Sequence, residues 1–583
     1  MRGIRYVIFW TTMAVLAGQY AVAGAGAPDL GVPEHTGPGT PGIEQVGDIQ
    51  FVANIGDNLN WSGSDIEFAS REVVKLSEGA TGDPVCVVDQ NDPEGCARDA
   101  EGNKVFQTEV RDFAILGGYG QFGRIIDVTN PAAPVHVKNT PCNISQNDIQ
   151  IYGDLLLVAA DGSGSCAKPD GSGNQTFQGT AVLDFSDPRN PTYLSRLTYA
   201  RGSHNHTFHP GGRYVYLSDS DLASAGLGNV PIWDLADPAN PVLVTDFKHL
   251  VHSPHDITFN ADGSRAYAAA VTATYILNTE DPRAPTVIAT IANEGISISH
   301  QSDPTPDGDF LLVSDELGGG AAGPVSSGGP VHVYDIRNEA VPVKVGTIGN
   351  DCVVASCEDN AAVHVSTSHV FRINPDGYTM AIAWYNDGVH VIDYSSIRGV
   401  SQWGVGTTSR VGARTIGRMK MPGANTWAAK MWDRHPGYVF ANDINRGFDV
   451  FYVPSMGPGY LARGTIHGGH PASFFAGVGV TKTEFETECQ YSPRSNGVDG
   501  WLAPVPASVA DGAHTITARS IDDQTGGLYD LDMYFYDANC GSLGASEEEG
   551  TNETADLPEG TRYVLTTAFV GGQVQLGLST SPA

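Results

Sequence analysis

A unit of two halves recurs along most of the sequence, and it constrains the fold more than any other feature. The first half is a short strand, a turn and an apolar strand. In four units the turn reads Pro-Gly-Gly, Ala-Asp-Gly or Pro-Asp-Gly. Asp-Gly favours a hairpin because Gly tolerates positive φ. The second half is an apolar strand ending in Asp, a Pro-bracketed turn and an outer strand, as in Ile232-Trp233-Asp234 with Pro238 and Pro241. Each unit therefore predicts four strands.

Four-stranded units of roughly 45 to 60 residues are typical of β-propeller blades. The sequence contains six such units and a degenerate seventh at residues 427–453, which lacks its outer strand. Residues 49–55 resemble the outer strands of the other units and precede the first inner strand. We predict that they complete the last blade, so that the two ends of the repeat region close the ring and cover the open sheet edges.

The Asp-x-x-x-Pro-x-x-Pro units, each after an apolar strand, resemble the LVIVD repeat family of seven-bladed β-propellers. The similarity covers about residues 46–455. The motif occurs four times with both prolines, counting Asn278 in place of Asp, and the copies at Asp335 and Asp393 are partial. The resemblance implies a seven-bladed β-propeller, which we assign to residues 46–464, and it implies little about function.

Residues 465–583 lack the repeat and are predicted to form a small β-sandwich accessory domain. The stretch from Asp530 to Asp537, followed by residues 557–560 and Tyr563, is similar to the bacterial pre-peptidase C-terminal domain. That resemblance implies a module that binds a substrate or a surface, with Ca²⁺ in acidic loops. An inert stabilising sandwich is the alternative. The expected fold class is all-β: a seven-bladed β-propeller followed by a small β-sandwich.

The first 23 residues have the pattern of a signal peptide. Arg2 and Arg5 precede an apolar run at 6–16, and Ala21-Val22-Ala23 offers small residues for cleavage. Residues 24–45 are rich in Gly and Pro and are expected to form a flexible leader. No later stretch approaches the roughly 20 apolar residues that span a bilayer. We therefore predict a secreted protein, extracellular or at the cell surface, without membrane insertion.

The charge composition limits the classes of binding partner that we expect. The 66 acidic residues outnumber the 33 basic ones, giving a net charge of −33. Nucleic acid phosphates require Lys and Arg, so nucleic acid is not an expected partner. An acidic shell that keeps an exported protein soluble is the simplest interpretation, with attraction of cations as the alternative.

Eight cysteines in an exported chain predict disulfide bonds. They form four couples that are local in sequence: Cys86 with Cys96, Cys142 with Cys166, Cys352 with Cys357, and Cys489 with Cys540. None has the spacing of a zinc finger, so we expect disulfides that stabilise loops.

Four units begin with a histidine: His204, His255, His300 and His369, each eight residues before its turn glycine. Ser64 and Asn147 hold this position in the first two units. The position begins the innermost strand of a blade, so it faces the central channel. Four consecutive blades are thus predicted to direct imidazoles into one space.

Neutral imidazole is the commonest protein ligand for divalent transition metals, here Fe, Cu or Zn. A metal held by these four histidines could activate water or O₂. Asp256 and Asp148 are expected to orient them or complete the shell, and His206 and Asp256 are the catalytic candidates. Structural histidines copied around the ring, and acid–base use without metal, are the alternatives.

Motifs for other chemistries are missing from the sequence: it has no Gly-x-Ser-x-Gly, no His-Glu-x-x-His and no P-loop. The leading hypothesis is a secreted metal-dependent enzyme, an oxidoreductase or a lyase, acting on a small-molecule or polymeric extracellular substrate. The alternative is a non-catalytic extracellular or cell-surface binding protein that uses propeller loops and the C-terminal domain.

Overall fold

The computed structural model describes residues 43–582 with internal gaps. The gaps are 57–60, 78, 80–81, 90–91, 147, 200–201, 220–227, 293–294, 317–328, 350–366, 396, 398–412, 468–499, 506–508, 510–513, 521–530, 540, 548–551 and 569–572. The predicted signal peptide and most of the predicted leader lie outside the described residues. Apart from one 3-10 turn at Pro454–Met456, the named elements are β-strands, as the sequence predicts.

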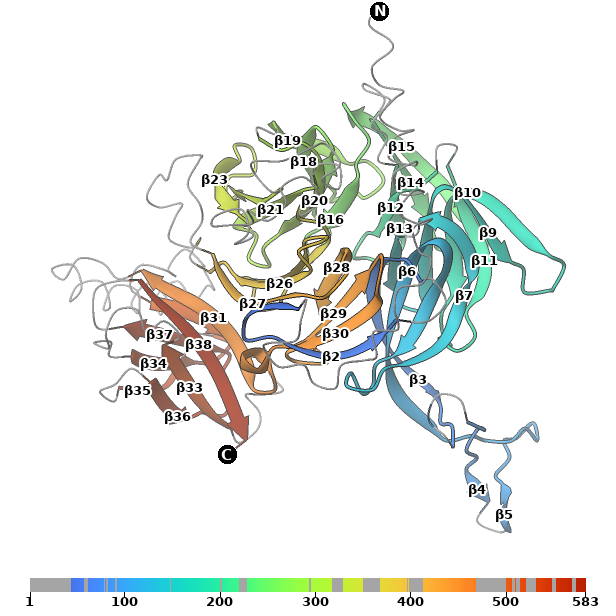
Figure 1. The fold of residues 1–583 in the computed structure, drawn as a ribbon, viewed down its shortest axis with the longest axis horizontal. Coiled ribbons are helices and arrows are strands. Elements are labelled where there is room, and N and C mark those ends of the chain that lie inside the picture. Colours follow the sequence, from blue (N-terminus) through green and yellow to red (C-terminus); the bar gives the residue numbers. More distant parts are fainter. Residues whose placement is uncertain are drawn as a thin grey trace, which may run out of the picture.

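Three central repeat units each fold as a four-stranded antiparallel sheet whose spatial order follows the chain. Figure 1 shows these sheets arranged around a common centre, which is the arrangement of a β-propeller. The sheets are β12 (Asn205–Phe208), β13 (Tyr214–Ser218), β14 (Gly228–Asp234) and β15 (Val242–Leu250); β16 (Asp256–Phe259), β17 (Arg265–Ala270), β18 (Ala273–Asn278) and β19 (Thr286–Ala292); β20 (Ser299–Pro304), β21 (Phe310–Asp315), β22 (Val331–Asp335) and β23 (Val343–Ile348).

The turns within each unit form as the residue types dictate. Gly263, between β16 and β17, has φ +74°, and a Cβ there would lie 2.4 Å from Nε2 of His209. Only glycine fits such a place without strain. In the second turn, the Asn278 side chain accepts a hydrogen bond from the backbone N–H of Glu280 at 3.0 Å, and Asp234 accepts one from Ala236 at 2.8 Å. The Asp or Asn that ends each third strand therefore shapes the turn.

Strands from the two ends of the repeat region pair with each other. β2 (Gln50–Ile55) lies beside β30 (Gly447–Tyr452) in a sheet completed by β29 (Tyr438–Asp443) and β28 (Thr426–Met431). This pairing confirms the predicted closure. A further strand, β1 (Glu44–Gly47), joins the sheet of β24 (Phe371–Ile373), β25 (Thr379–Ala383), β26 (Val389–Asp393) and β27 (Arg414–Lys420).

The first two units share one seven-stranded sheet. A long strand, β6 (Thr108–Asp127), pairs with β3 (Gly63–Val74) on one side and with β7 (Val135–Gln146) on the other. β7 then extends onto β9 (Leu155–Ala167), which lies between β8 (Ile149–Tyr152) and β10 (Asn174–Asp184), and β11 (Thr192–Thr198) forms the edge. A disulfide between Cys142 and Cys166 joins the two units at this extension. Because two units merge, the count of seven blades stays a prediction.

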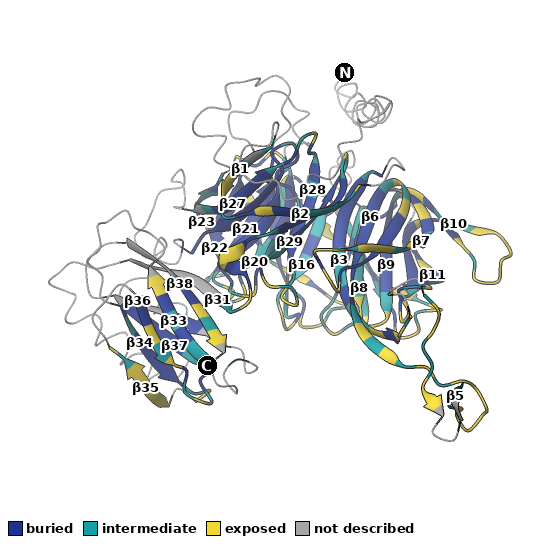
Figure 2. Cartoon of the chain, turned by 60° about the horizontal axis from the view of Figure 1, so that its bottom comes forward, coloured by how far each residue is buried: buried dark blue, intermediate teal, exposed yellow. Residues whose placement is uncertain are grey.

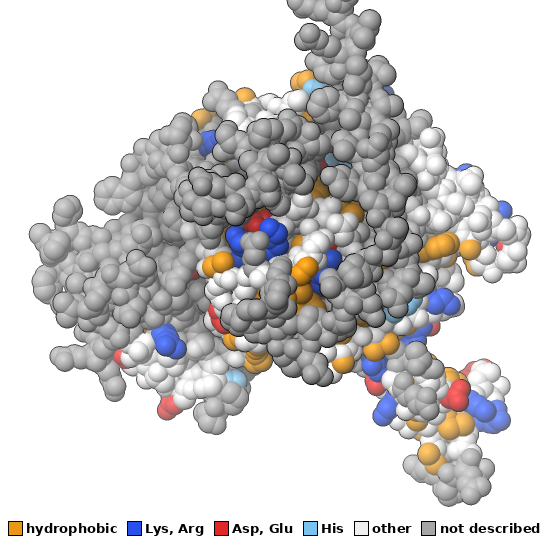
Figure 3. Space-filling view, in the orientation of Figure 1, with side chains coloured by type: hydrophobic (Ala, Val, Ile, Leu, Met, Phe, Trp, Pro, Cys, Tyr) orange, Lys and Arg blue, Asp and Glu red, His pale blue; other side chains and the backbone are white. Residues whose placement is uncertain are grey.

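The insertion after β3 forms an arm that extends away from the propeller (Figure 1). It carries the strands β4 (Val88–Asp89) and β5 (Asp92–Cys96) and the predicted disulfide between Cys86 and Cys96. Hydrophobic side chains lie exposed along it, as Figure 3 shows. Among them are Val88, at 54% exposed, and Phe106, at 36%. The predicted couples at Cys352/Cys357 and Cys489/Cys540 lie outside the described residues.

We expect replacement of both arm cysteines, Cys86→Ser with Cys96→Ser, to leave the melting temperature of the propeller within about 2 °C of wild type. The arm contributes little to the core of the propeller, so we expect the substitutions to change its free energy of unfolding by less than roughly 1 kcal/mol. A change of that size shifts the melting temperature of a large domain by only a few degrees. Limited proteolysis should instead cut the arm faster. A large drop in melting temperature would show that the arm supports the fold.

The C-terminal region forms two four-stranded sheets. One contains β31 (Tyr460–His467), β38 (Gln573–Pro582), β33 (His514–Ser520) and β36 (Asn552–Asp556); the other contains β32 (Gly500–Pro504), β37 (Tyr563–Ala568), β34 (Leu531–Tyr536) and β35 (Ser542–Ser546). Buried apolar residues of both sheets, among them Ile516, Met533 and Val564, form one core. Figure 2 shows the buried strands of this unit and of the propeller in dark blue. The likeness to the pre-peptidase C-terminal domain stays a prediction.

Candidate functional site

The inner strands of the units alternate between the core and the channel. If the histidine position of each unit is counted as the first, the third residue packs in the core, as for Ile66, Ile149 and Ile257, each at most 2% exposed. The second and fourth residues contact their counterparts in the next unit: Asn205 Nδ2 donates to Asp256 Oδ1 at 2.8 Å. This alternation is the period of two that a β-strand imposes. The histidine directly precedes the second residue, so it lies at one end of the channel.

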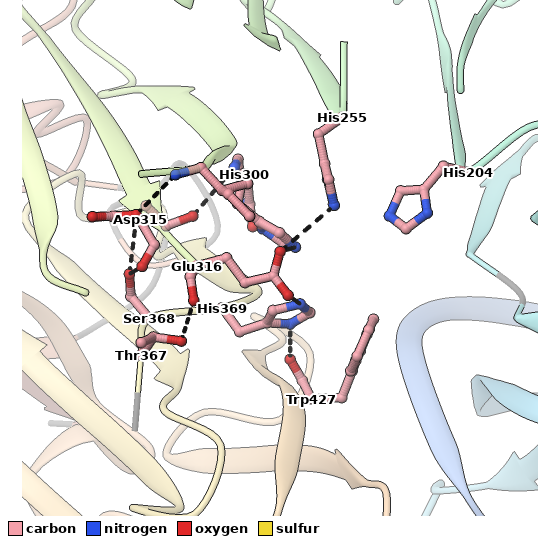
Figure 4. Close-up of polar contacts among 12 residues, drawn as sticks. His204, His255, His300, Asp315, Glu316, Thr367, Ser368, His369 and Trp427 are labelled. Atoms are coloured by element: carbon pink, nitrogen blue, oxygen red, sulfur yellow. Dashed lines mark hydrogen bonds and ion pairs between the residues drawn. The ribbon is translucent and has the colours of Figure 1, made fainter. Parts of the chain in front are cut away.

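The four predicted histidines lie side by side in consecutive units; we call them the histidine cluster (Figure 4). The imidazole centroids are 4.1 Å apart between His204 and His255, 4.1 Å between His255 and His300, and 4.0 Å between His300 and His369. All four line one cavity, and they are mostly buried. Ser64 lies at the same position in the first unit and is buried, whereas Asn147 lies outside the described residues.

Glu316, which sequence reasoning missed, faces three of the four imidazoles. Its carboxylate oxygens lie 3.9 Å from Nε2 of His255, 4.0 Å from Nε2 of His300 and 3.9 Å from Nε2 of His369. Figure 4 shows the Glu316 side chain directed into the cluster. These distances exceed the 3.2 Å or so that a nitrogen–oxygen hydrogen bond allows. Three ring nitrogens therefore surround one carboxylate without bonding to it.

His204 is placed differently from the other three histidines. Its Nδ1 lies 3.4 Å from Asp161 Oδ2. Burial alone would lower the pKa of His204, but the hydrogen bond and the charge of Asp161 outweigh it and raise that pKa. A protonated imidazole cannot bind a metal ion. The prediction that His204 is a metal ligand thus gains no support from its contacts, although no finding tests it.

His369 has its tautomer fixed by the backbone. Its Nδ1 lies 2.6 Å from the carbonyl oxygen of Trp427, and a carbonyl can only accept a hydrogen bond. Nδ1 must therefore carry the proton, which leaves the lone pair on Nε2, the nitrogen that faces Glu316. Nε2 has no hydrogen-bond partner among the described residues, although His369 is only 1% exposed. This is the arrangement that orients histidine ligands of metals.

Glu316 is held by a tyrosine. Tyr385 donates from its hydroxyl to Glu316 Oε1 at 2.9 Å and packs its ring 4.7 Å from that of His369. Its backbone has φ 43°, which is uncommon for a bulky residue. Such conformations persist where the surrounding structure fixes them, often at functional sites.

Burial and mutual proximity set the charge of the cluster. Burial, with the charges of neighbouring histidines, keeps the pKa of His255 and His300 well below the usual range, and burial lowers the pKa of His369 to about 3. Burial also raises the pKa of Glu316, against the hydrogen bond from Tyr385. Burial thus favours the neutral imidazole in these three histidines and disfavours the charge on Glu316.

The cluster closes one end of a cavity of about 290 Å³ in the channel. Trp427 and the channel-facing residues of the inner strands line it, including Asp148, Asp256 and Lys430. Glu316 is not among its lining residues. The histidines therefore lie between Glu316 and the cavity.

Both catalytic candidates line the cavity. Burial together with the charge of Asp303 raises the pKa of Asp256 to about 7. The Nδ1 atom of His206 lies 3.4 Å from the hydroxyl of Thr180 on β10. A catalytic role for His206 finds no support in this contact and stays a prediction.

A divalent transition metal fits the donors present here. Two donors that each bind one ion at about 2.1 Å lie no more than about 4.2 Å apart. The three Nε2-to-carboxylate distances meet this limit. The ligand atoms of His255, His300 and Glu316 lie within 4.8 Å of one another, so a shift of a few tenths of an ångström would close the set around an ion.

Tyr385→Phe is expected to lower metal affinity about tenfold, because residues that orient a metal ligand contribute 10- to 100-fold and this one makes a single bond. The phenyl ring keeps the packing against His369, so the melting temperature of the metal-free protein should change little. Competition with a chelator of known affinity measures the effect. Unchanged affinity would mean that Tyr385 does not position Glu316.

No protein-family model matches this chain, and no curated protein matches it. Among solved structures, the chain is similar to the β-propeller domain of Myceliophteria thermophila Cps50 (Swd1), with 12% identity, a TM-score of 0.40, and coverage of 58% of this chain and 93% of that one. It is also similar to a functionally unknown protein from Desulfotomaculum acetoxidans, with 14% identity, a TM-score of 0.35, and coverage of 53% of this chain and 86% of that one. The arrangement of the sheets around a common centre defines the protein as a β-propeller.

Proposed function

We propose that this protein is an exported metal-dependent enzyme whose metal ion is held on the propeller axis by His255, His300, His369 and Glu316. One observation carries the proposal. Three imidazole Nε2 atoms lie 3.9–4.0 Å from the carboxylate oxygens of Glu316, two of them from Oε2 and one from Oε1, too far for hydrogen bonds and within the span of ligands that share one ion. Of these three nitrogens, Nε2 of His369 is buried without a hydrogen-bond partner among the described residues.

Fe, Cu or Zn in this set would supply Lewis acidity toward water or O₂. The chain's own groups prepare the set. The Trp427 carbonyl keeps the proton of His369 on Nδ1, and Tyr385 holds Glu316 in place. His204, which faces Asp161 and lines the cavity, can keep a proton next to the substrate. A nucleophile motif is missing from the sequence, which favours an oxidoreductase or a lyase.

The signal-peptide pattern and the disulfides support export. Disulfides persist in oxidising compartments and are rare in the cytosol. Cys86–Cys96 and Cys142–Cys166 are both formed. Within the described residues, we find no helix with the length and hydropathy needed to cross a bilayer.

Metal analysis tests the proposal. The protein is purified without an affinity tag that binds metal, reconstituted in turn with Fe²⁺, Cu²⁺ and Zn²⁺, and freed of excess ion. One of these metals should be retained at about one per chain, and the His255→Ala, His300→Ala double variant should retain little. Less than about a tenth of an ion per chain in the wild type would contradict a metal site, since structural and catalytic His sites bind far more tightly than that.

A further inference from the structure

The cavity beneath the histidine cluster has an excess of carboxylates. Seven ionisable residues other than histidine line it: Asp65, Glu67, Asp148, Asp256, Asp303, Arg372 and Lys430. Five of these are acidic and two are basic. An anionic substrate would meet net repulsion there, because buried charges of one sign are costly to bring together.

Both cations of the cavity are already paired. Lys430 Nζ lies 2.8 Å from Asp65 Oδ1 and 3.0 Å from Glu67 Oε1. The Arg372 guanidinium lies 2.5 Å from the same Glu67 oxygen. Neither cation is therefore free to receive an anionic ligand.

Among the described residues, no Lys or Arg forms an ion pair with any of the three remaining aspartates, although Lys430 attracts each of them from a longer distance. Asp256 accepts a hydrogen bond from Asn205, and Asp303 accepts hydrogen bonds from Thr258 at 2.7 Å and from Gln301 at 3.0 Å. Asp148 accepts one from the N–H of Ile149. Neutral donors satisfy part of each carboxylate, and burial raises the pKa of all three because Lys430 and Arg372 act on them only from beyond ion-pair distance. A ligand with a positive charge would supply what the protein does not.

The histidines give a second, independent sign of a ligand. The Nδ1 atom of His300 has no hydrogen-bond partner among the described residues, although this side chain is only 4% exposed and lines the cavity. When Nε2 binds a metal, Nδ1 carries the proton and requires an acceptor oxygen. The cavity also contains the ring of Trp427, and aromatic faces attract organic cations.

We propose that the cavity binds a small organic amine in its cationic form that also carries a hydroxyl or carbonyl oxygen. The ammonium group lies among Asp148, Asp256 and Asp303, and the oxygen lies toward the histidine cluster. The volume of about 290 Å³ is at the small end of ligand pockets, about 300–1,000 Å³, so a polymer would not fit inside. The inference that such an amine is the substrate rests on the proposed function. Binding of the amine does not itself require the metal.

A matched series of four-carbon probes tests the inference by calorimetry on the full-length protein, with and without metal. The probes are 4-amino-1-butanol, 1-butylamine, 1,4-butanediol and 4-hydroxybutanoate. We expect the amino alcohol to bind tightest, at least tenfold more tightly than the diol, whose ammonium is missing. Asp303→Asn should weaken amino alcohol binding about tenfold and leave diol binding unchanged. Asp335→Asn, whose carboxylate pairs with Arg337 outside the cavity, is the matched control.

Equal or tighter binding of any other member of the series overturns the inference, and so does Ca²⁺ competing the amino alcohol out of the wild-type site. The wild-type series needs no variant, so a poorly folded Asp303→Asn does not obstruct the test. The two proposals fail separately. A protein that binds metal but no amine refutes the substrate class alone, and one that binds the amine but no metal refutes the metal enzyme alone.

Discussion

Glu316→Gln is expected to weaken metal binding at least about 100-fold, the upper range for groups around a metal site, because it removes a charged ligand. The amide keeps the size of the side chain and can still accept the hydrogen bond from Tyr385. It cannot supply the negative charge that three neutral imidazoles lack. Chelator competition on the reconstituted protein, followed by metal analysis, measures the loss.

His206→Gln is the matched control for Glu316→Gln. His206 is a buried histidine of the same unit as His204, and its ring contacts Thr180 instead of Glu316. We expect its affinity for metal to stay within about twofold of wild type. If Glu316→Gln binds metal as the wild type does, the carboxylate is not a ligand. If His206→Gln alone loses the metal, the ligand set has been assigned to the wrong side of the strand.

The repeat pattern predicts the architecture well because the residues that determine the strands and turns of each unit lie within that unit. The turn glycines, the Asp that shapes the second turn and the alternating apolar residues are local in sequence, so four-stranded sheets follow from them. The pairing of β2 with β30 was also predictable, because the last unit lacks an outer strand and residues 49–55 have no other partner. The merging of the first two units was not, since it depends on the length of β7 and β9.

Part of the site was also within reach of the sequence. Equal spacing from the turn glycines brings the four histidines together, and the structure places them side by side. Trp427 holds the same position in the seventh unit, three residues before Lys430 as His369 is three before Arg372. Extending the alignment to that degenerate unit would have found it.

Glu316 was missed because it follows the end of β21, whereas the histidines lie at the starts of the inner strands. It comes three residues after Val313, the residue paired with the third position of its inner strand. Ile382 and Val158 are the corresponding paired residues in two other units. Tyr385 and Asp161 each follow them by three residues. The residues around the cluster therefore follow a second register of the repeat, which becomes visible only once the strand pairing is known.

Lys430→Met is expected to destabilise the propeller by about 3–5 kcal/mol, the usual cost of removing one partner from a buried ion pair. Lys430 is 5% exposed, and its ammonium group holds Asp65 and Glu67 of the first unit. The substitution leaves these carboxylates in the channel with one cation fewer, at the junction where the first and last units meet. Chemical denaturation at pH 7, with strand structure followed by circular dichroism, measures the change.

Arg213→Met is the control for the same measurement. Its guanidinium is 56% exposed and pairs with Asp234 at the surface, so we expect a cost below about 1 kcal/mol. A cost for Lys430→Met no larger than that of Arg213→Met would show that the channel ion pairs do not stabilise the ring.

The same ion pairs predict how stability depends on pH. Burial alone would raise the pKa of Glu67, but the charges of Arg372 and Lys430 outweigh it and lower that pKa to about 2 from its usual 4.5. A carboxylate whose pKa is lower in the folded than in the unfolded state stabilises the fold at pH values above the unfolded-state pKa. For Glu67 this stabilisation is lost as the pH falls from 4.5 toward 2. In Glu67→Gln this part of the acid sensitivity should vanish, together with part of the stability at pH 7. Denaturation of both proteins at pH 7, 4 and 3 separates the two effects: parallel losses in wild type and variant would mean that Glu67 does not carry the pH dependence.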